Sequence, residues 1–386
     1  MATETRKKLN VPITKPALGE EEARAPFDSI KSGWVTQGPK VAEFEKAVAA
    51  YVGAKHGVAT TLCTTGLHLA LATAGVGKDD EVIVPSFTFI ASANAILYTG
   101  ADVVFCEIDP QTFNIDPNDI EKRITKKTKA IMPIDQIGLS ADMDAVNAIA
   151  KKHGLDVIED AAPAIGEEYK GRKVGSNAHQ TVFSFHPRKV ITTGEGGMIT
   201  TDDDAFADRA RKLRAHGMSV SDLDRHKSDR VIIEEYPELG FNYRMTDIQA
   251  SIGLVQLRRL DELLRIRREK AQRYNTELAE VKGIEVPFVP KYASHTYQSY
   301  CLRLTKDCRL DREDLMTNLL RRGIATRRGV MASHLEKTYT SRYGKVSLPV
   351  TEHATQTTML IPLFAAMTDE EQSWVIESLR EELGTR

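Results

Sequence analysis

Residues 183–197, FSFHPRKVITTGEGG, place a lysine between an apolar segment and a glycine-rich turn. The apolar start predicts the end of a buried strand, and the glycines let the backbone fold back closely. Lys189 is therefore expected to be partly desolvated, which lowers its pKa and makes the neutral, nucleophilic amine accessible. A lysine that forms a Schiff base needs this property. For Lys189 taken alone, the alternative is a strand-end lysine that extends into solvent.

A carboxylate pair precedes this lysine in the sequence. Residues 155–158 predict a short buried strand that ends at Glu159 and Asp160. In parallel α/β sheets, ligands bind outside the carboxyl ends of strands. An acidic side chain at this place suits the ring nitrogen of pyridoxal 5'-phosphate (PLP), which is held by a lysine Schiff base and an acidic partner. A helix N-cap is the other interpretation of Asp160, and the local sequence leaves both open.

A third element lies at residues 59–72, where hydroxyl side chains precede an apolar, helix-forming run. The unpaired N–H groups and positive dipole end of such a helix form an anion site, here expected to bind the phosphate of the cofactor. Thr64 as a plain N-cap explains the local sequence equally well. The sequence contains neither a GxGxxG nor a GxxxxGK[ST] loop, so hydride transfer and nucleotide hydrolysis lack their usual signatures.

Taken in this order, the three elements resemble the sugar aminotransferases of the DegT/DnrJ/EryC1/StrS family, within the fold-type I PLP enzymes. The resemblance is long, and the order and spacing of its motifs are specific. The motifs are residues 32–39 (SGWVTQGP), 84–91 (VPSFTFIA), 159–162 (EDAA), 184–189 (SFHPRK), 240–249 (GFNYRMTDIQ) and 360–364 (LIPLF).

The resemblance implies roles for individual residues. Lys189 would form the Schiff base and then move the proton between substrate and cofactor carbons. Asp160 would keep the pyridine nitrogen protonated. Thr64, Thr65 and Ser184 would bind the phosphate.

Further contacts are implied around the cofactor and between subunits. Phe89 falls where the family stacks an aromatic ring on the cofactor, although core packing is an equal alternative from the residues alone. Trp34, in the first motif, is a candidate substrate contact. Asn242 falls where the family reaches the phosphate of the neighbouring subunit, which implies a homodimer with shared active sites. Residues 218–235, rich in Ser, Asp and Arg, suit a surface excursion that reaches over a neighbour.

The chain departs from the family pattern at several positions. Pro163 stands where relatives often carry Gln or His, and Asp135 stands where many have His. Arg327 and Arg328 replace more familiar residues, whereas His334 keeps its place. We interpret this as an altered acceptor pocket, in which the arginines either clamp an amino-donor carboxylate or a diphosphate, or are simply exposed at a strand end.

Composition agrees with a two-domain enzyme. The chain has 386 residues, is 41% hydrophobic and 27% charged, and carries a formal net charge of -2, which argues against nucleic-acid binding. Residues 1–8 lack the apolar core of a signal peptide, and no apolar run is long enough to span a membrane. The four cysteines are scattered, so neither a disulfide framework nor a structural metal site is expected, and a cytoplasmic location fits.

Strand and helix patterns alternate along the first half of the chain. This alternation predicts an α/β fold in which a mainly parallel sheet lies between helices. With the resemblance, it implies a large PLP-binding domain over residues 1–250, followed by a linking helix and a small α/β C-terminal domain over residues 251–386. The expected strands are residues 82–84, 103–105, 130–133 and 156–158, and the expected helices are residues 90–97, 118–124, 143–152 and 246–281.

The resulting prediction is a PLP-dependent aminotransferase. It would move an amino group from glutamate, or a similar donor, to a ketosugar, expected to be a nucleotide-linked keto-deoxysugar. One alternative is an aminotransferase for an inosose or another unactivated cyclic ketone. A non-catalytic PLP-binding regulator is an alternative of a different class, and it would require loss of Lys189 or Asp160, both of which are present.

Overall fold

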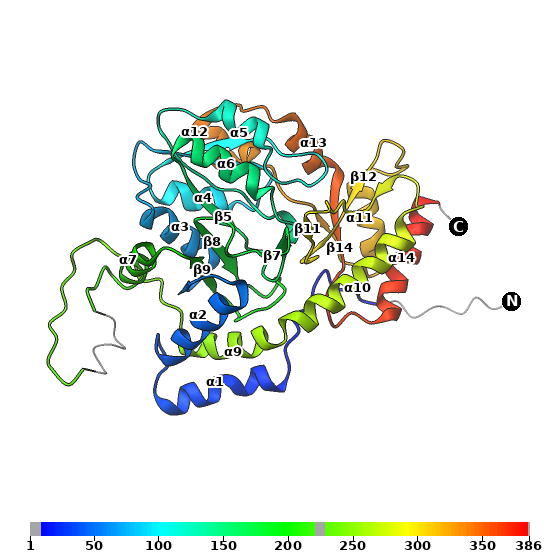
Figure 1. Ribbon diagram of the computed structural model, residues 1–386. Coiled ribbons are helices and arrows are strands. Elements are labelled where there is room, and N and C mark those ends of the chain that lie inside the picture. Colours follow the sequence, from blue (N-terminus) through cyan, green and yellow to red (C-terminus); the bar gives the residue numbers. More distant parts are fainter. Residues whose placement is uncertain (1–8, 221–227, 385–386) are drawn as a thin grey trace.

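The computed structural model describes residues 9–220 and 228–384, so residues 1–8, considered above for a signal peptide, lie outside the described part. The large central sheet has seven strands, and helices lie on both of its faces (Figure 1). Its four internal pairings from β3 to β8 are parallel, whereas β9 is antiparallel to both of its neighbours. In sheet order the strands are β1 (His56–Thr60), β9 (Gly197–Thr201), β8 (Gln180–Ser184), β5 (Asp156–Asp160), β4 (Thr128–Ile131), β2 (Glu81–Pro85) and β3 (Asp102–Cys106).

Strand alternation explains why helices cover both faces of this sheet. Neighbouring residues of a strand point to opposite faces. Val82 and Val84 of β2 enter one core, whereas Ile83 enters another on the opposite face. The first core includes residues of α3 (Cys63–Thr73), α4 (Ala91–Tyr98) and α7 (Asp204–Arg214). The other face is covered by α2 (Pro39–Val52), α5 (Pro117–Arg123), α6 (Met143–His153) and α9 (Asp247–Arg258).

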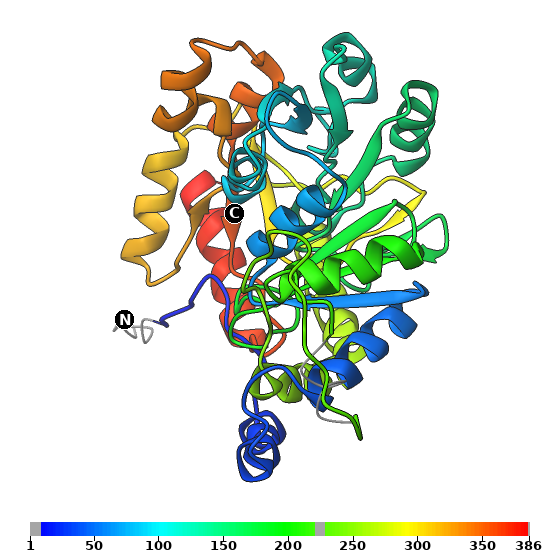
Figure 2. The same ribbon diagram turned by 90° about the vertical axis from the view of Figure 1, so that its left-hand side faces the viewer.

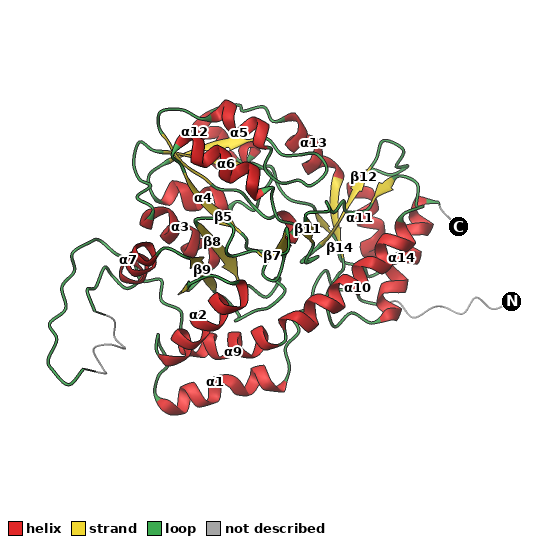
Figure 3. Ribbon diagram, viewed as in Figure 1, coloured by secondary structure: helices red, strands yellow, loops and turns green. Residues whose placement is uncertain are grey.

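Two smaller sheets complete the α/β fold. A four-stranded antiparallel sheet, in the order β10-β12-β14-β13, packs with α10, α11 and α14 around a second large core. A short three-stranded sheet, β11-β6-β7, lies between the two larger parts (Figure 3). Their elements are β6 (Glu168–Tyr169), β7 (Arg172–Lys173), β10 (Ile284–Glu285), β11 (Ala293–Ser294), β12 (Tyr300–Leu304), β13 (Arg327–Arg328), β14 (Thr358–Ile361), α10 (Leu260–Leu278), α11 (Arg312–Arg321) and α14 (Asp369–Leu383).

The predicted strands and helices of the first half all appear, each with bounds within three residues of those expected. The long helix expected over residues 246–281 is present as α9 and α10, which are separated only by Arg259. It runs from the large sheet towards the small one, as Figure 1 shows. The mixed α/β fold with a mainly parallel sheet is therefore confirmed.

The domain boundary at residue 250 stays a prediction, and two segments cross it. Val11, near the N-terminus, is fully buried in the core of the small sheet and forms a bridge with Ile324. Tyr339, in α12 (Lys337–Tyr343), packs instead into the core of the large sheet. Figure 2 shows α1 (Glu20–Ser32), in dark blue, at the edge of the molecule.

The excursion expected at residues 218–235 leaves the body of the molecule next to α7 (Figure 1). Its described residues, 218–220 and 228–235, contain no helix or strand, and residues 221–227 lie outside the described part. Val231 and Ile233 are 95% and 85% exposed, so this segment presents apolar side chains to solvent. Within the described ranges, no helix has the length and apolar character needed to cross a bilayer.

Candidate active site

Asp160 and Ser184 lie at the carboxyl ends of two adjacent parallel strands. Asp160 ends β5 and pairs with Val182 of β8, and Ser184 ends β8 two residues later. Lys189 follows in the turn between β8 and β9, where its N–H donates to the His186 carbonyl at 2.8 Å. The fold therefore brings the predicted lysine and carboxylate to one edge of the large sheet, where ligands bind in such folds.

Asp160 is a buried carboxylate with two donors of its own. Its side chain is 4% exposed and accepts hydrogen bonds from Ser92 Oγ at 2.7 Å and from Ala162 N at 3.1 Å. Burial raises the pKa of Asp160, whereas these donors and the nearby Lys189 lower it. No helix starts in the segment after β5, because the next element is β6 at Glu168, so the N-cap interpretation of Asp160 is wrong.

Lys189 has the environment that the sequence predicts. Burial lowers the pKa of its amine, and Cys63 and Asp160 act in the opposite direction. The adjacent Arg188 lowers the pKa further. An amine held this way reaches its neutral, nucleophilic form more readily than an exposed lysine.

The first backbone amides of α3 have no acceptor within the helix, and they lie near this lysine, since Cys63 is an electrostatic neighbour of Lys189. Its N-cap is Leu62, which has no side-chain hydrogen bond to the first turn, so Thr64 is not the N-cap. Thr65 Oγ1 is engaged within the turn, since it accepts from Leu62 N at 3.1 Å and donates to Leu62 O at 2.8 Å. Thr64 and the first-turn amides are therefore the better phosphate candidates of this segment.

Gly197, the first residue of β9, shows why a glycine is needed after the turn that carries Lys189. A Cβ atom at this position would lie 2.6 Å from Leu62 O and 2.8 Å from Cys63 N. Such contacts are too close for any side chain. The glycine therefore allows β9 to approach the start of α3, which brings the lysine turn and the anion site together.

Phe89 is exposed rather than packed in the core. Its side chain is 59% exposed, which excludes the core-packing interpretation. Its carbonyl accepts from Ser92 N at 3.1 Å, so the exposed ring lies one turn from the serine that binds Asp160. Ser92 has no counterpart in the sequence prediction.

His334 is held inside the protein. Its Nδ1 lies 2.6 Å from Ser86 Oγ, its Nε2 lies 3.4 Å from Glu352, and the residue is 1% exposed. The neighbouring Ser333 also donates from its N–H to the Ser86 carbonyl at 2.8 Å. This burial favours a scaffold role, in which His334 fixes the segment after β13 against the segment that leads to Phe89.

The two adjacent arginines of β13 have different neighbours. Arg328 forms an ion pair with Glu336 at 3.6 Å. Arg327 is instead an electrostatic neighbour of Arg188, whose pKa is lowered by burial and then by the Arg327 guanidinium. The small sheet is tied to this turn, because Gln298 Nε2 donates to the Arg188 carbonyl at 2.6 Å. Alternation along a strand explains the split, since successive side chains point to opposite faces.

Arg188 is a candidate that the sequence reasoning missed, although it stands in the quoted motif directly before Lys189. The local sequence gives no indication of it, because the neighbour of Arg188 is Arg327, which lies 139 positions further along the chain (327 − 188). The pair places two cationic groups, one from each part of the fold, beside the lysine turn.

A family model decides what this arrangement represents. The model of the DegT/DnrJ/EryC1/StrS aminotransferase family matches residues 16–380. The chain belongs to this family.

Similar proteins match this chain over almost its entire length. It is 40% identical over 375 residues to the spore coat polysaccharide biosynthesis protein SpsC of Bacillus subtilis (strain 168), with 96% of each chain covered. PseC from Helicobacter pylori, an aminotransferase involved in the biosynthesis of pseudoaminic acid, has a TM-score of 0.91 at 27% identity, covering 98% of this chain and 100% of that chain. The PLP form of Spr1654 from Streptococcus pneumoniae has a TM-score of 0.90 at 29% identity, covering 97% and 99%.

The predicted enzyme class and cofactor are thereby confirmed. The protein is a PLP-dependent sugar aminotransferase of the DegT/DnrJ/EryC1/StrS family. The residues at the edge of the sheet fit PLP. Lys189 offers a desolvated amine, Asp160 a buried carboxylate, the start of α3 an uncapped set of amides, and Phe89 an exposed ring.

Trp34 and Asn242 have their described contacts elsewhere. Trp34 packs next to Gly38, where a Cβ atom would lie 2.7 Å from its ring. Asn242 is exposed, accepts from Arg244 Nε at 3.2 Å, and forms a backbone bridge with Ala215. Their proposed roles therefore depend on substrate or on a second subunit.

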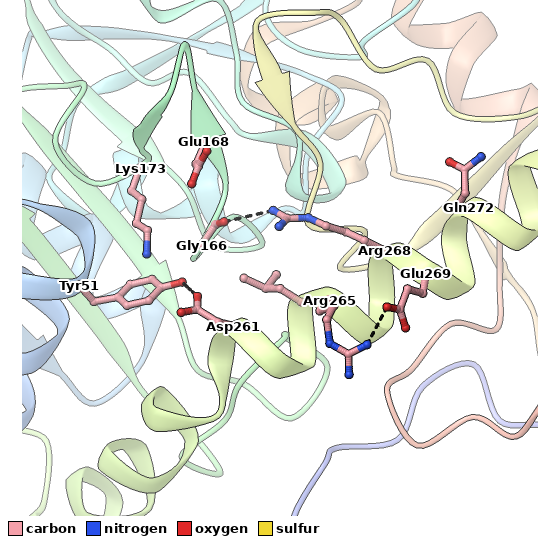
Figure 4. A pocket seen from close by; sticks show the side chains of 10 residues that line it. Tyr51, Gly166, Glu168, Lys173, Asp261, Arg265, Arg268, Glu269 and Gln272 are labelled. Carbon is pink, nitrogen blue, oxygen red and sulfur yellow. Dashed lines mark hydrogen bonds and ion pairs between the residues drawn. The ribbon is translucent and has the colours of Figure 1, made fainter.

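A cavity of about 660 Å³ lies apart from these residues, between α10 and the β6–β7 hairpin (Figure 4). Its polar groups bind one another. Tyr51 donates to Asp261 at 2.5 Å, and Arg265 pairs with Glu269 at 2.6 Å. Lys189 and Asp160 do not line it. The cavity is therefore a surface hollow apart from the candidate active site. Among the residues that the structure describes, no cluster of three or more His, Cys, Asp or Glu could hold a metal ion.

Proposed function

We propose that this enzyme transfers the amino group of glutamate, or a similar donor, to a nucleotide-linked keto-deoxysugar. The observation that carries the proposal is the electrostatic influence of Arg327 on Arg188, the residue before Lys189, at a turn that Gln298 joins to the C-terminal part of the chain. Guanidinium groups bind phosphates and carboxylates through paired, charge-assisted hydrogen bonds. Both proposed substrates are anionic, so two cations suit a donor carboxylate and an acceptor diphosphate, whereas with an inosose only the donor carries a charge for them to bind.

The chain's own residues account for the proton movements. PLP, when bound, supplies an electron sink for the carbanion that forms at the amino-bearing carbon. The Lys189 amine, with its lowered pKa, would bind the cofactor and then remove and return the proton at the reacting carbon. The Asp160 carboxylate would hold the proton of the ring nitrogen, while Ser92 and Ala162 fix the direction of that carboxylate.

The remaining roles are proposed from position. Ser184, Thr64 and the first-turn amides of α3 would bind the phosphate, with Thr65 supporting the turn. Phe89 would stack on the cofactor ring, consistent with its exposure in this chain.

We further propose a homodimer with shared active sites and a cytoplasmic location. Exposed apolar side chains support an interface. Phe27 and Ile30 on α1 are 60% and 56% exposed, and Leu239, after the excursion, is 91% exposed. Asn242 follows this apolar segment and would reach the phosphate of the partner subunit. Trp34, which is partly buried next to α1, would contact substrate.

A substrate panel tests the proposed reaction. The enzyme would be incubated with glutamate and with matched ketones that differ only in the presence of the nucleotide diphosphate, and amino-sugar products would be measured by mass spectrometry. We expect conversion of one or more nucleotide-linked ketosugars, and little conversion of the free sugar or an inosose. Equal or better conversion of the uncharged ketones would contradict the nucleotide-linked assignment.

The arginines provide a matched pair of variants. Arg327→Gln is expected to raise KM for an anionic substrate about tenfold, since tenfold corresponds to about 1.4 kcal/mol of binding free energy. Arg328→Gln removes a similar charge one residue away but only breaks the ion pair with Glu336, so its KM should change little. Steady-state kinetics at two salt concentrations would distinguish them. A larger effect of Arg328→Gln would show that the anion binds on the other face of β13.

Shared active sites predict complementation between two inactive chains. Lys189→Ala and Asn242→Ala chains would be mixed under conditions that exchange subunits, and heterodimers would be isolated by differential tags. In the heterodimer, the chain that keeps Lys189 receives an intact Asn242 from its partner, so one of the two sites is complete. Activity should therefore exceed that of either parent. If confirmed heterodimers show no recovery while the Asn242→Ala parent is clearly impaired, Asn242 acts within its own chain.

A further inference from the structure

Three carboxyl groups are buried directly behind Asp160. Asp135, Glu159 and Glu167 are each 0% exposed. Isolated buried carboxylates are costly, so such groups are paired, hydrogen-bonded or protonated. None of the three has a role in the chemistry proposed above.

Asp135 and Glu159 hold the strand residue that carries the catalytic carboxylate. Glu159 precedes Asp160 in β5, so the two side chains point to opposite faces of the sheet. The backbone around Asp135 runs beside Asp160. Asp160 N donates to Pro133 O at 2.9 Å, and Asp135 N donates to Asp160 O at 3.1 Å. Any displacement of Asp135 therefore acts on the main chain of Asp160.

In both Asp135 and Glu159, one carboxyl oxygen accepts a hydrogen bond and the other does not. Asp135 Oδ1 accepts from Ala141 N at 3.1 Å, and Glu159 Oε2 accepts from Thr181 Oγ1 at 2.6 Å. The other two oxygens, Asp135 Oδ2 and Glu159 Oε1, are buried without an N–H or O–H donor from the described residues. Asp135 and Glu159 are close enough to influence each other electrostatically, because each acts on the pKa of the other. If both were ionised, neither would have a proton with which to bind the free oxygen of the other.

We propose that Asp135 and Glu159 share one proton, and that this acid pair acts as a positioning element for Asp160. The shared proton satisfies both remaining oxygens at once, and it leaves a single negative charge on the rear face of β5 instead of two. The functional part of the inference depends on the proposed role of Asp160 as the partner of the ring nitrogen. Asp135 and Glu159 contact neither substrate nor cofactor in this scheme.

The surrounding charges favour retention of the proton. Burial raises the pKa of Glu159 to about 7, and Asp160 acts in the same direction. Burial, followed by Glu159, Glu167 and Asp160, raises the pKa of Asp135. Burial also raises the pKa of Glu167 well above its usual range, and the nearby cation, the Arg268 guanidinium, opposes this rise. His295, on the same side as Arg268, has its pKa lowered by burial to about 3 and is therefore neutral near pH 7.

The sign of the pH dependence follows from this arrangement. Below the folded-state pKa the pair holds its proton and the hydrogen bond between the carboxyl groups is intact. As pH rises through that value, the proton is lost and two buried carboxylates repel each other. This repulsion displaces Asp135, whose backbone is bonded to that of Asp160. The Asp160 carboxylate should therefore be less well positioned at pH values above this pKa.

Infrared spectroscopy of the wild-type protein tests the shared proton directly. At about pH 6, exposed carboxyl groups are ionised and lack the carbonyl stretch of a carboxylic acid. We expect the pair to give one such band that exchanges slowly in heavy water, separate from any band of Glu167, whose pKa burial also raises. Asp135→Asn and Glu159→Gln should each remove it, and the double variant should remove no more, because only one proton is involved. Glu167→Gln is the matched control and should leave this band in place.

Three spectroscopic outcomes would overturn the inference. These are absence of any acid band in the wild type, loss of two separate bands that add in the double variant, and disappearance of the band in Glu167→Gln. Each single amide can still donate to the remaining carboxylate, so the single variants are expected to fold. If they do not fold, the Glu167→Gln spectrum is decisive, because an acid band that remains there cannot come from Glu167.

The pH profile of cofactor affinity tests the positioning role. PLP would be titrated into the apoprotein at a series of pH values. The wild type and Glu167→Gln should lose affinity by at least about fivefold across the titration of the pair, the lower end of typical coupling between sites. Asp135→Asn should lack this step, and persistence of the step would contradict the positioning role. Failure of the wild type to bind PLP at any pH would instead contradict the proposed cofactor site, while the infrared result would still stand.

Discussion

Replacement of Lys189 by alanine is expected to abolish attachment of the cofactor to the chain and to reduce turnover by roughly a thousandfold or more, since general acid–base catalysis alone contributes about 10²–10⁴-fold. The reason is that Lys189 has two roles in the proposed chemistry. Its desolvated amine binds the cofactor, and the same amine moves the proton at the reacting carbon. Alanine can do neither. Visible absorbance of the purified variant and single-turnover kinetics with glutamate would measure the two losses separately.

Lys173→Ala is a suitable control for this variant. Lys173 lies over the ring of Tyr51 at 3.5 Å, in the surface cavity away from Asp160. Its loss should leave the absorbance and the turnover almost unchanged. If the Lys189→Ala protein still binds its cofactor through a lysine and turns over normally, a different lysine performs the chemistry.

Replacement of Asp160 by asparagine is expected to reduce turnover about a hundredfold, equivalent to roughly 2.7 kcal/mol in the barrier, while the fold is retained. An amide cannot keep the ring nitrogen protonated, so the electron sink is weakened. The fold should tolerate the change, because burial already opposes the charge of Asp160. The asparagine side chain can also still bind Ser92 and the Ala162 amide. Thermal unfolding and steady-state kinetics of the same preparation provide both readouts.

Ser92→Ala tests the orientation of the Asp160 carboxylate separately from its charge. It removes one 2.7 Å hydrogen bond to Asp160 but leaves the carboxylate ionised. Its effect should be smaller than that of Asp160→Asn, about tenfold, because the Ala162 amide still binds the carboxylate and the lower end of the range for a hydrogen bond to a charged group, about 1.5 kcal/mol, corresponds to roughly that factor. Near-normal turnover in Asp160→Asn would show that the ring partner is another residue.

Much of the large sheet was predictable, because its strands are short apolar runs separated by helices. The small sheets were not. Five of their strands, β6, β7, β10, β11 and β13, contain two residues each, which is too few to display a period-2 pattern. The burial of Val11 beside the small sheet also had no local signal, since it results from a single bridge to Ile324.

The positions of site residues were predictable where the neighbouring residues in the sequence determine them. Lys189 and Asp160 each follow an apolar strand, so their placement could be derived from neighbouring residues. Ser92 could not be found in this way, because it is an ordinary residue of α4 that meets Asp160 from 68 positions away. Two further residues could not be judged from the sequence. His334 was expected at the site but is held inside the protein by Ser86, whereas Arg188 had no predicted role but is an electrostatic neighbour of the distant Arg327.

Transfer of the isotope-labelled amino nitrogen of glutamate to a sugar is the most direct test of the account. The wild-type enzyme would be incubated with the labelled donor and the preferred nucleotide-linked ketosugar, with Lys189→Ala in parallel. We expect a labelled amino sugar together with 2-oxoglutarate in equal amounts, and neither product from the variant. A labelled product from the variant, or an unlabelled or absent product from a wild-type enzyme that holds its cofactor, would contradict it.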